Sequence, residues 1–598
     1  MPPNPRLSQK PVDLFLNRRL KLWYAVLIFI LVIFVARLFY LQIIRHDYYN
    51  SAAQAAQLKE YEIPAERGII KAYENGSAVP LVLNQKLHTL FADPTLIKDT
   101  DVVATKLAAI TKADAGEYAK AMRTPNTRYV ALAKRLSEEQ KDQIMALKLS
   151  GVGTQAQDYR VYAQGLLAAQ LLGFVNNDGK GKYGIEEALD SELAGTAGRL
   201  KAVTDAAGVP LAASKENTEI APKNGSDIIL TIDIGMQKQL ETLLKAGVDR
   251  AKSPSGSALI IEANSGKVKA MANWPSYDPA EFYKVSDPSL FNNSSVSSPL
   301  EVGSIMKSLT VAAALDLGVI EPDTSYYDPG KWHLDDHDIT NIEEVGGPGT
   351  RTVGEIITRS INTGATWMLM QMGGETGSVN KKARERWYDY MANHFNLGKA
   401  TGIEQGYEAS GQIPDPHKGF ALELTYANTA FGQAMTATPL QMGLALASIV
   451  NGGSYYQPQL VDGIVNDSGQ AGTKKSKVLH ANAVSQRVSA QVRQLLYNAL
   501  RQKVANGTRY LDFPKDYEVG GKTGTAQIAK PRGGYYTDRY NGTYIGYVGG
   551  NQPEYVIAVR INEPKIGGYA GSQAAQPLFA EIAHMLINNF NVTPKGGG

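Results

Sequence analysis

The chain has 598 residues, of which 43% are hydrophobic and 20% charged, and this composition is typical of a folded protein with roughly two to four domains. The formal net charge is only +3, and no basic block is long enough to follow a phosphate backbone, so nucleic acid is not an expected partner. The absence of cysteine excludes disulfides, cysteine-zinc sites and thiol catalysis.

The N-terminal tail, residues 1–21, is proline-rich and polar, and an apolar segment follows it. Residues 22–36 read LWYAVLIFILVIFVA, and the apolar character continues to residue 44 with one interruption at Arg37. A helix over 22–44 is long enough to span a bilayer. A signal peptide is the alternative, but it would have a shorter apolar region and small residues at a cleavage site. We therefore predict a retained transmembrane helix.

The basic residues around this segment predict its orientation. Only Arg45 follows it closely, whereas five basic residues precede it: Arg6, Lys10, Arg18, Arg19 and Lys21. By the positive-inside rule the tail lies in the cytoplasm and the chain after residue 44 lies outside the cytoplasmic (inner) membrane. The prediction is a single-pass membrane protein with its folded part on the extracytoplasmic side.

The remaining chain divides near residue 222, into 45–222 and 223–598. The first part is a mixed region with a helical stretch at 137–151 and no catalytic cluster. In the second, residues 257–273 and 543–561 each read as two strands around a tight turn, which indicates antiparallel pairing. Helices are predicted from Ser304, near 354–364 and over 572–590. The fold class is therefore α+β, with helices packed on an antiparallel sheet.

A lysine lies inside the apolar helix predicted at residue 304. The sequence EVGSIMKSLTVAAALDLGVI, residues 301–320, places Lys307 three residues after Ser304. Residues with this spacing share one face of a helix, and a buried lysine loses its proton more readily than a solvated one. A neutral Lys307 could take the hydroxyl proton of Ser304, which makes Ser304 a candidate nucleophile. Because the Ser-x-x-Lys string recurs by chance, a partly exposed pair is the alternative.

Two more motifs follow in chain order. RSINTG contains Ser360 and Asn362, and GGKTGTAQ contains Lys522, Thr523, Gly524 and Thr525. Ser-x-x-Lys, then Ser-x-Asn, then Lys-Thr-Gly is the ordered signature of penicillin-binding proteins and serine β-lactamases.

The residue types fit acyl transfer. Ser360 can relay a proton to the leaving amine, and the Asn362 amide can hold Lys307 and the substrate backbone. Lys522 supplies positive charge on an exposed strand edge, and Gly524 lets a substrate backbone approach that edge. The backbone N–H groups of Ser304 and Thr525 form the predicted oxyanion hole, and the Thr523 and Thr525 hydroxyls are free to bind a carboxylate.

From residue 22 to the terminal helix the chain resembles a class B penicillin-binding protein, a peptidoglycan DD-transpeptidase. Further segments carry the likeness, among them ILTIDIGMQKQLE at 229–241 and FGQAMTATPLQMGLALASIVNGG at 431–453. In the region 45–222, IPAERGII with Arg67, RVYAQG with Arg160 and GKYGIEEALDSELAGTAG with Glu186 resemble three short motifs that are structural in the family. The resemblance implies an elongated pedestal (dimerisation-type) domain over 45–222 and a transpeptidase domain over 223–598.

The resemblance also implies substrates and partners. Ser304 would attack the penultimate D-alanine carbonyl of a peptidoglycan stem peptide, and β-lactams would acylate the same serine. No glycosyltransferase motif is found between the anchor and the transpeptidase domain, so glycan polymerisation would come from a partner, by analogy a SEDS-family enzyme, alongside other cell-wall synthesis proteins. The alternatives are a β-lactamase or DD-carboxypeptidase that resolves the acyl-enzyme with water, and a non-catalytic penicillin sensor or cell-wall scaffold.

No cofactor is expected. The stretch HLDDHD, residues 333–338, has two histidines four residues apart among carboxylates, which suits a divalent metal. It follows YYDPGKW in what reads as a polar hairpin or loop, and we therefore predict no metal site there.

Overall fold

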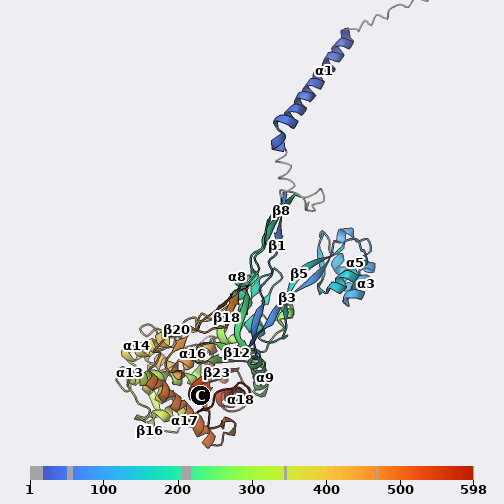
Figure 1. The fold of residues 1–598 in the computed structure, drawn as a ribbon. Coiled ribbons are helices and arrows are strands. Elements are labelled where there is room, and N and C mark those ends of the chain that lie inside the picture. The colour runs from blue at the N-terminus through green and yellow to red at the C-terminus, as the bar shows by residue number, and fades with distance from the viewer. Residues whose placement is uncertain are drawn as a thin grey trace, which may run out of the picture. The chain divides into compact units, whose positions relative to one another are not determined.

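The structure, a computed structural model, describes residues 18–49, 58–203, 217–341, 346–466, 469–531 and 533–596 (Figure 1). The chain divides into two compact units. One consists of Met1–Ala65 with Thr196–Lys223, and the other of Glu66–Gly195 with Asn224–Gly598.

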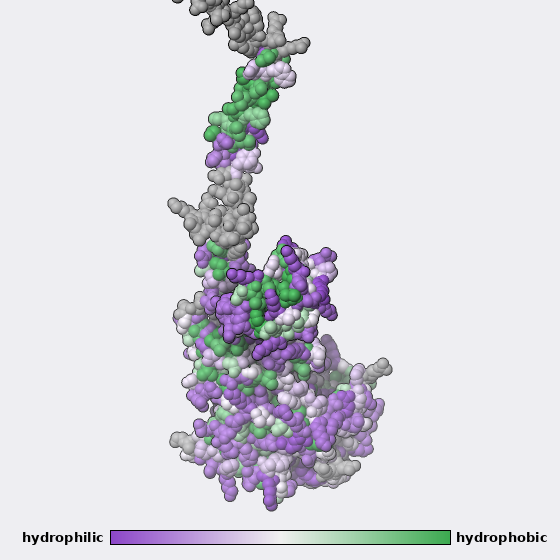
Figure 2. Space-filling view, turned by 90° about the vertical axis from the view of Figure 1, so that its right-hand side faces the viewer, coloured by the Kyte–Doolittle hydropathy of each residue, from purple (hydrophilic) through white to green (hydrophobic). Residues whose placement is uncertain are grey.

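The first unit contains the apolar helix and a small sheet. Helix α1 (Arg18–Phe39) continues into a π-helical turn (Tyr40–Ile44), and Leu20–Ile44 is long and apolar enough to cross a membrane. The side chains of residues 20–39 are exposed, and Figure 2 shows hydrophobic side chains along the helix. The sheet is antiparallel in the order β1-β8-β9, with the bounds Leu58–Ile63, Gly198–Val203 and Thr218–Ile220. The helix agrees with the predicted membrane span.

In the second unit, a seven-stranded sheet takes strands from both sides of residue 222. The strand order is β19-β18-β10-β2-β3-β4, with β5 also paired to β3, and β10 runs parallel to β2. The bounds are β2 Ile70–Glu74, β3 Ser77–Ala92, β4 Val130–Leu136, β5 Val152–Tyr162, β10 Asp227–Asp233, β18 Val461–Val465 and β19 Ala471–Thr473. The pedestal region and the C-terminal region are therefore joined by backbone hydrogen bonds.

Strands β3 and β5 extend from this sheet to a helical module (Figure 1). The module contains α3 (Thr100–Thr111), α4 (Ala115–Met122) and α5 (Glu138–Ala146), which pack around Leu90, Leu107 and Tyr118. Helix α5 begins with a capping box between Ser137 and Gln140, which satisfies two backbone N–H groups that a helix end leaves open. The helix predicted at 137–151 is confirmed, and it ends earlier than expected.

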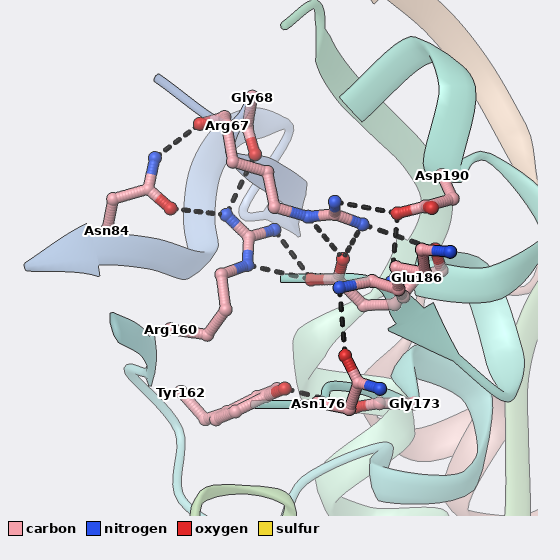
Figure 3. Close-up of polar contacts among 11 residues, drawn as sticks. Arg67, Gly68, Asn84, Arg160, Tyr162, Gly173, Asn176, Glu186 and Asp190 are labelled. Carbon is pink, nitrogen blue, oxygen red and sulfur yellow. Dashed lines mark hydrogen bonds and ion pairs between the residues drawn. The ribbon is translucent and has the colours of Figure 1, made fainter. Parts of the chain in front are cut away.

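The three pedestal motifs meet in one buried ionic cluster (Figure 3). Both oxygens of the fully buried Glu186 are paired, one with Arg67 and one with Arg160, each across 2.6 Å. Arg160 also donates to Asn84 Oδ1 at 2.6 Å, and Arg67 pairs with Asp190 at 2.7 Å. A buried carboxylate with two guanidinium partners avoids the cost of an unpaired buried charge. The cluster fastens β5 and the short helix at Glu186 to the segment that leads into β2.

The C-terminal region is built on a five-stranded antiparallel sheet in the order β12-β11-β23-β22-β21. Both predicted hairpins are confirmed: β11 (Ser255–Glu262) pairs with β12 (Val268–Trp274), and β22 (Tyr535–Gly549) pairs with β23 (Pro553–Asn562). Strand β21 (Glu518–Ala529), which contains the Lys-Thr-Gly motif, lies at the edge of the sheet and pairs with β22.

Helices cover both faces of this sheet. Alternate residues of a strand point to opposite faces, and here the residues on both faces are apolar and buried. Ala258 and Ile260 of β11 pack in a core with α9 (Ile234–Arg250) and α18 (Gln576–Asn589). Leu259 and Ile261 belong to a second core with α11 (Lys307–Asp316) and α16 (Pro439–Val450). The predicted α+β class is confirmed, and the segment of Ser304, the candidate nucleophile, lies on the second face.

Candidate active site

Ser304 lies in a tight turn before α11. Residues Gly303–Met306 form a 3-10 helix, and α11 begins at Lys307, so the prediction of a regular helix from Ser304 is wrong for its first turn. Gly303 has a φ of +64°, and a Cβ there would lie 2.7 Å from the backbone oxygen of Thr525. Only glycine fits both the conformation and the space. The turn still brings Lys307 Nζ to 2.9 Å from Ser304 Oγ, as the spacing predicted.

Lys307 is fully buried and has only neutral partners among the described residues. Its Nζ donates to the backbone oxygen of Ser360 and to Asn362 Oδ1, both at 2.7 Å. Burial, together with the nearby charge of Lys522, holds the pKa of Lys307 well below its usual range. The structure therefore favours the neutral amine that the sequence predicted.

The hydrogen bonds of Lys307 also orient that amine. A neutral amine has two N–H bonds and one lone pair. The Ser360 carbonyl and Asn362 Oδ1 can only accept, so they occupy the two N–H bonds. The lone pair then remains for the hydroxyl of Ser304, which is the geometry that proton abstraction requires.

Ser360 and Asn362 lie at a break between two helices. The sequence predicted one helical segment here, but α12 (Val353–Arg359) ends and α13 begins at Asn362 (Asn362–Gly373). Ser360 stands between them with a φ of +59°, a conformation that is unfavourable for residues other than glycine. This break gives Lys307 access to the carbonyl of Ser360 and to the side chain of Asn362.

Lys522 differs from its prediction in one respect. It lies on the edge strand β21, as expected, but its side chain is only 4% exposed rather than exposed. The cause is packing of α17 (Gln486–Ala505) and of the Ser360 segment against this strand, where Lys522 Nζ donates to Ser360 Oγ at 2.9 Å. Burial, and the charge of Lys503, lower the pKa of Lys522 well below its usual range. The Ser360 hydroxyl thus links the two motif lysines.

The remaining motif residues surround the turn at Gly303. The backbone contact between Gly303 and Thr525 places the segments of Ser304 and Thr525, whose N–H groups are the predicted oxyanion donors, side by side. The Thr525 hydroxyl accepts from the Gly571 N–H at 2.9 Å, so it is engaged rather than free, although its own proton can still be donated. Thr523 Oγ1 lies 3.5 Å from Lys522 Nζ.

Gly524 has a packing role that the sequence did not indicate. A Cβ at Gly524 would meet Thr543 Oγ1 at 2.2 Å and the backbone oxygen of Val302 at 2.7 Å. The space beside this glycine is therefore filled by the protein itself, on the side where the turn that contains Ser304 lies. A side chain there would push apart the strand and the turn.

A cavity of about 490 Å³ opens on Ser304. Its lining includes the motif residues Ser304, Ser360, Asn362, Thr523 and Thr525. It also includes Phe431 and Gln433, which lie in the segment 431–453 that resembles the family, and three residues that no such segment contains: Lys503, Tyr540 and Tyr569. The sequence does contain a signal for Lys503 that the motif search did not use. Lys503 follows Leu496 and Ala499 on the buried face of an amphipathic helix. A lysine on an apolar helix face is the same signal that marked Lys307.

The HLDDHD stretch forms a surface hairpin, as it was read from the sequence. Strands β14 (Lys331–Leu334) and β15 (His337–Thr340) pair, and Asp338 contacts both His333 and Lys331 at 2.9 Å. Within the described ranges no group of three or more histidine, aspartate or glutamate residues is placed to hold a metal ion.

Two models of known protein families together match most of the chain. Residues 256–584 match the family model described as the penicillin binding protein transpeptidase domain. Residues 62–230 match the one described as the penicillin-binding protein dimerisation domain.

Among curated proteins, the chain is 30% identical to the penicillin-binding protein PbpB of Mycobacterium tuberculosis, over 95% of this chain and 84% of that protein. It is 29% identical to stage V sporulation protein D of Bacillus subtilis, over 95% of this chain and 86% of that protein. It is 26% identical to the peptidoglycan D,D-transpeptidase FtsI of Escherichia coli (97% and 93%).

Solved structures show the same fold. Penicillin binding protein 3 of M. tuberculosis, complexed with ampicillin, is 25% identical with a TM-score of 0.66, over 90% of this chain and 98% of that one. Penicillin binding protein 2X of Streptococcus thermophilus is 21% identical with a TM-score of 0.68, over 89% and 81%.

Proposed function

This chain belongs to the class B penicillin-binding proteins, the monofunctional peptidoglycan D,D-transpeptidases, and on that basis we propose that it cross-links stem peptides through an acyl-enzyme on Ser304. The observation that carries the proposal is the buried Lys307, whose Nζ is 2.9 Å from Ser304 Oγ and whose other short contacts are to neutral acceptors. It supplies a base where the nucleophile needs one.

In the first half-reaction, Ser304 Oγ attacks the carbonyl of the penultimate D-alanine and its proton passes to Lys307 Nζ. The developing oxyanion is held by the N–H groups of Ser304 and Thr525. Collapse breaks the peptide bond, and the terminal D-alanine leaves after its nitrogen receives a proton through the Ser360 hydroxyl, which contacts both Lys307 and Lys522.

In the second half-reaction, the amine of another stem peptide attacks the acyl carbonyl and loses a proton to Lys307. As the bond from the acyl carbon to Ser304 Oγ breaks, Lys307 returns a proton to that oxygen. Asn362 holds Lys307 in position throughout. Before acylation, Lys522 and the hydroxyls of Thr523 and Thr525 bind the carboxylate of the donor's terminal D-alanine, and Gly524 keeps this strand close to the turn that holds Ser304. β-Lactams, whose ring carbonyl resembles the donor peptide bond, acylate Ser304 in the same way.

We also propose a membrane topology and partners. Residues 1–21 lie in the cytoplasm, 22–44 span the cytoplasmic membrane, and the pedestal (45–222) and transpeptidase domain (223–598) lie outside. Glycan strands come from a partner glycosyltransferase of the SEDS family, together with other cell-wall synthesis proteins. Support comes from the charge asymmetry around the apolar helix and from the absence, in the sequence between the anchor and the catalytic region, of a motif for glycan polymerisation.

The test uses the full-length chain in detergent with a donor stem pentapeptide and an amine acceptor. Cross-linked product and free D-alanine in equal amounts are expected. Release of D-alanine without cross-linked product would mean that water resolves the acyl-enzyme, as in a carboxypeptidase. The lifetime of a penicilloyl adduct separates the β-lactamase alternative, since turnover within seconds would overturn the transpeptidase proposal.

A further inference from the structure

Lys503 is a half-buried cation in the cavity that opens on Ser304. It belongs to the last turn of α17, and Ala499 and Leu500 beside it on the helix are buried. It lines the cavity together with Ser304, Ser360, Thr523 and Thr525. None of the three sequence motifs contains it, and no step of the reaction described above uses it.

One neutral side chain holds Lys503 in place. Its Nζ donates to Gln576 Oε1 at 3.2 Å, and Gln576, the first residue of α18, is only 3% exposed. The Tyr510 hydroxyl lies 3.5 Å from the same oxygen. The amine is therefore held at the cavity wall by a neutral group, which does not compensate its charge.

Lys503 and Lys522 face a common space. Both line a small cavity with Thr523 and Gln576. The two amines are close enough to each other for the charge of Lys503 to lower the pKa of Lys522. The described hydrogen bonds of the two amines are with Gln576, Ser360 and the oxygens of Thr523, and none of them is with a carboxylate. The charge of Lys503 disfavours the charged form of Lys522, and burial of either ammonium without a counterion costs free energy, so a bound anion would favour the charged form of both amines.

The cavity that opens on Ser304 also contains basic residues without acidic ones among its described lining. The described residues that line it include Arg359 and Lys503 but no aspartate or glutamate, and several hydroxyls, among them Thr523 and Ser572, are present as donors. Arg359 is placed near Glu355, at 3.8 Å, whereas the two lysines have no such neighbour among the described ion pairs. An anion that enters the cavity from solvent would supply the negative charge that the lining residues lack.

We propose that Lys503 is a second substrate-binding cation, which together with Lys522 binds the carboxylate of the D-alanyl donor and of β-lactams. The inference rests on the proposed function. It adds a binding residue from α17 to those of the Lys-Thr-Gly strand, so that α17 and α18 become part of the site for the donor peptide. Burial lowers the pKa of Lys503 to about 8, so its charge is largely present at neutral pH, and a bound carboxylate stabilises that charge.

The test compares two forms of one ligand. The second-order rate of acylation is measured for the full-length chain in detergent with a penicillin that has its free carboxylate, and with the methyl ester of the same penicillin. The variants are Lys503→Met, which keeps length and removes charge, and Lys503→Arg, which keeps charge. Gln502→Met, at the neighbouring exposed position of α17, is the matched control.

Lys503→Met is expected to slow acylation by the free acid about 10- to 100-fold, the range for loss of one charged hydrogen bond, and to leave the ester rate within about twofold. Lys503→Arg should restore part of the difference, and Gln502→Met should change neither rate. Equal losses with both ligands, or no loss with either, would overturn the inference while the wild-type rate still supports the proposed function. A wild-type chain that neither ligand acylates would overturn both.

Discussion

The Ser360 backbone oxygen and the Lys307 amine are joined by a hydrogen bond of 2.7 Å, and the Ser360 hydroxyl lies 3.2 Å from the same amine. A non-glycine residue in a left-handed conformation makes this double contact possible. The strain at Ser360 is thus located where it orients the lysine, which in turn directs its lone pair at Ser304.

Lys307→Arg is expected to abolish acylation by a fluorescent penicillin and to leave the fold intact. A guanidinium keeps its proton at every accessible pH, so it cannot act as the base. The measurements are labelling of the full-length chain and its thermal unfolding, with Lys331→Arg on the surface hairpin as the control. Labelling near the wild-type rate would contradict the role of Lys307 as the base.

Asn362→Asp is expected to shift the pH dependence of acylation upward. A carboxylate at the Oδ1 position, now 2.7 Å from Lys307 Nζ, favours the protonated amine and raises its depressed pKa. In the wild type, acylation should fall as the pH drops through the lowered pKa of Lys307. In the variant the fall should begin at a higher pH, with at least about a tenfold loss at pH 7. Unchanged pH profiles would mean that Lys307 is not the titrating group.

Glu186→Gln in the pedestal is expected to destabilise the protein by about 3–5 kcal/mol, because the change leaves Arg67 and Arg160 buried without their carboxylate. Urea unfolding of the second unit is the measurement, and Glu139→Gln, at an exposed position of α5, is the control. The folded fraction should still be acylated at the wild-type rate, since the cluster is not among the residues that line the active-site cavity. Loss of acylation without loss of stability would contradict a structural role.

Lys503→Met is expected to raise the unfolding free energy at neutral pH. Because the folded pKa of Lys503 is about 8 and its ordinary value is 10.5, the unfolded chain binds more protons between these values, and stability rises with pH across that window. The variant lacks this group, so its advantage of about 1–3 kcal/mol at pH 7 should shrink as the pH approaches about 10. A constant difference at all pH values would show that hydrophobicity, not charge, accounts for it.

Local patterns predicted the hairpins, the apolar helix and the meeting of Ser304 with Lys307, since each depends on spacing within a short segment. They did not predict the left-handed Ser360, the buried side chain of Lys522 or the exposure of Lys503 to the cavity. Those features arise from the packing of α17 on the edge strand, of α12 on α17, and of the Ser360 segment on Lys522, which are contacts between residues far apart in the sequence. The pairing of Arg67 with Glu186, 119 residues apart, has the same origin.

Covalent labelling with a fluorescent penicillin, followed by mass spectrometry of the labelled peptide, tests the central claim most directly. The full-length wild-type chain in detergent is compared with Ser304→Ala, and folding of both is checked by thermal unfolding. We predict one stable adduct on the wild type, located on Ser304, and none on the variant. An adduct on another residue, or equal labelling of the variant, would contradict Ser304 as the nucleophile.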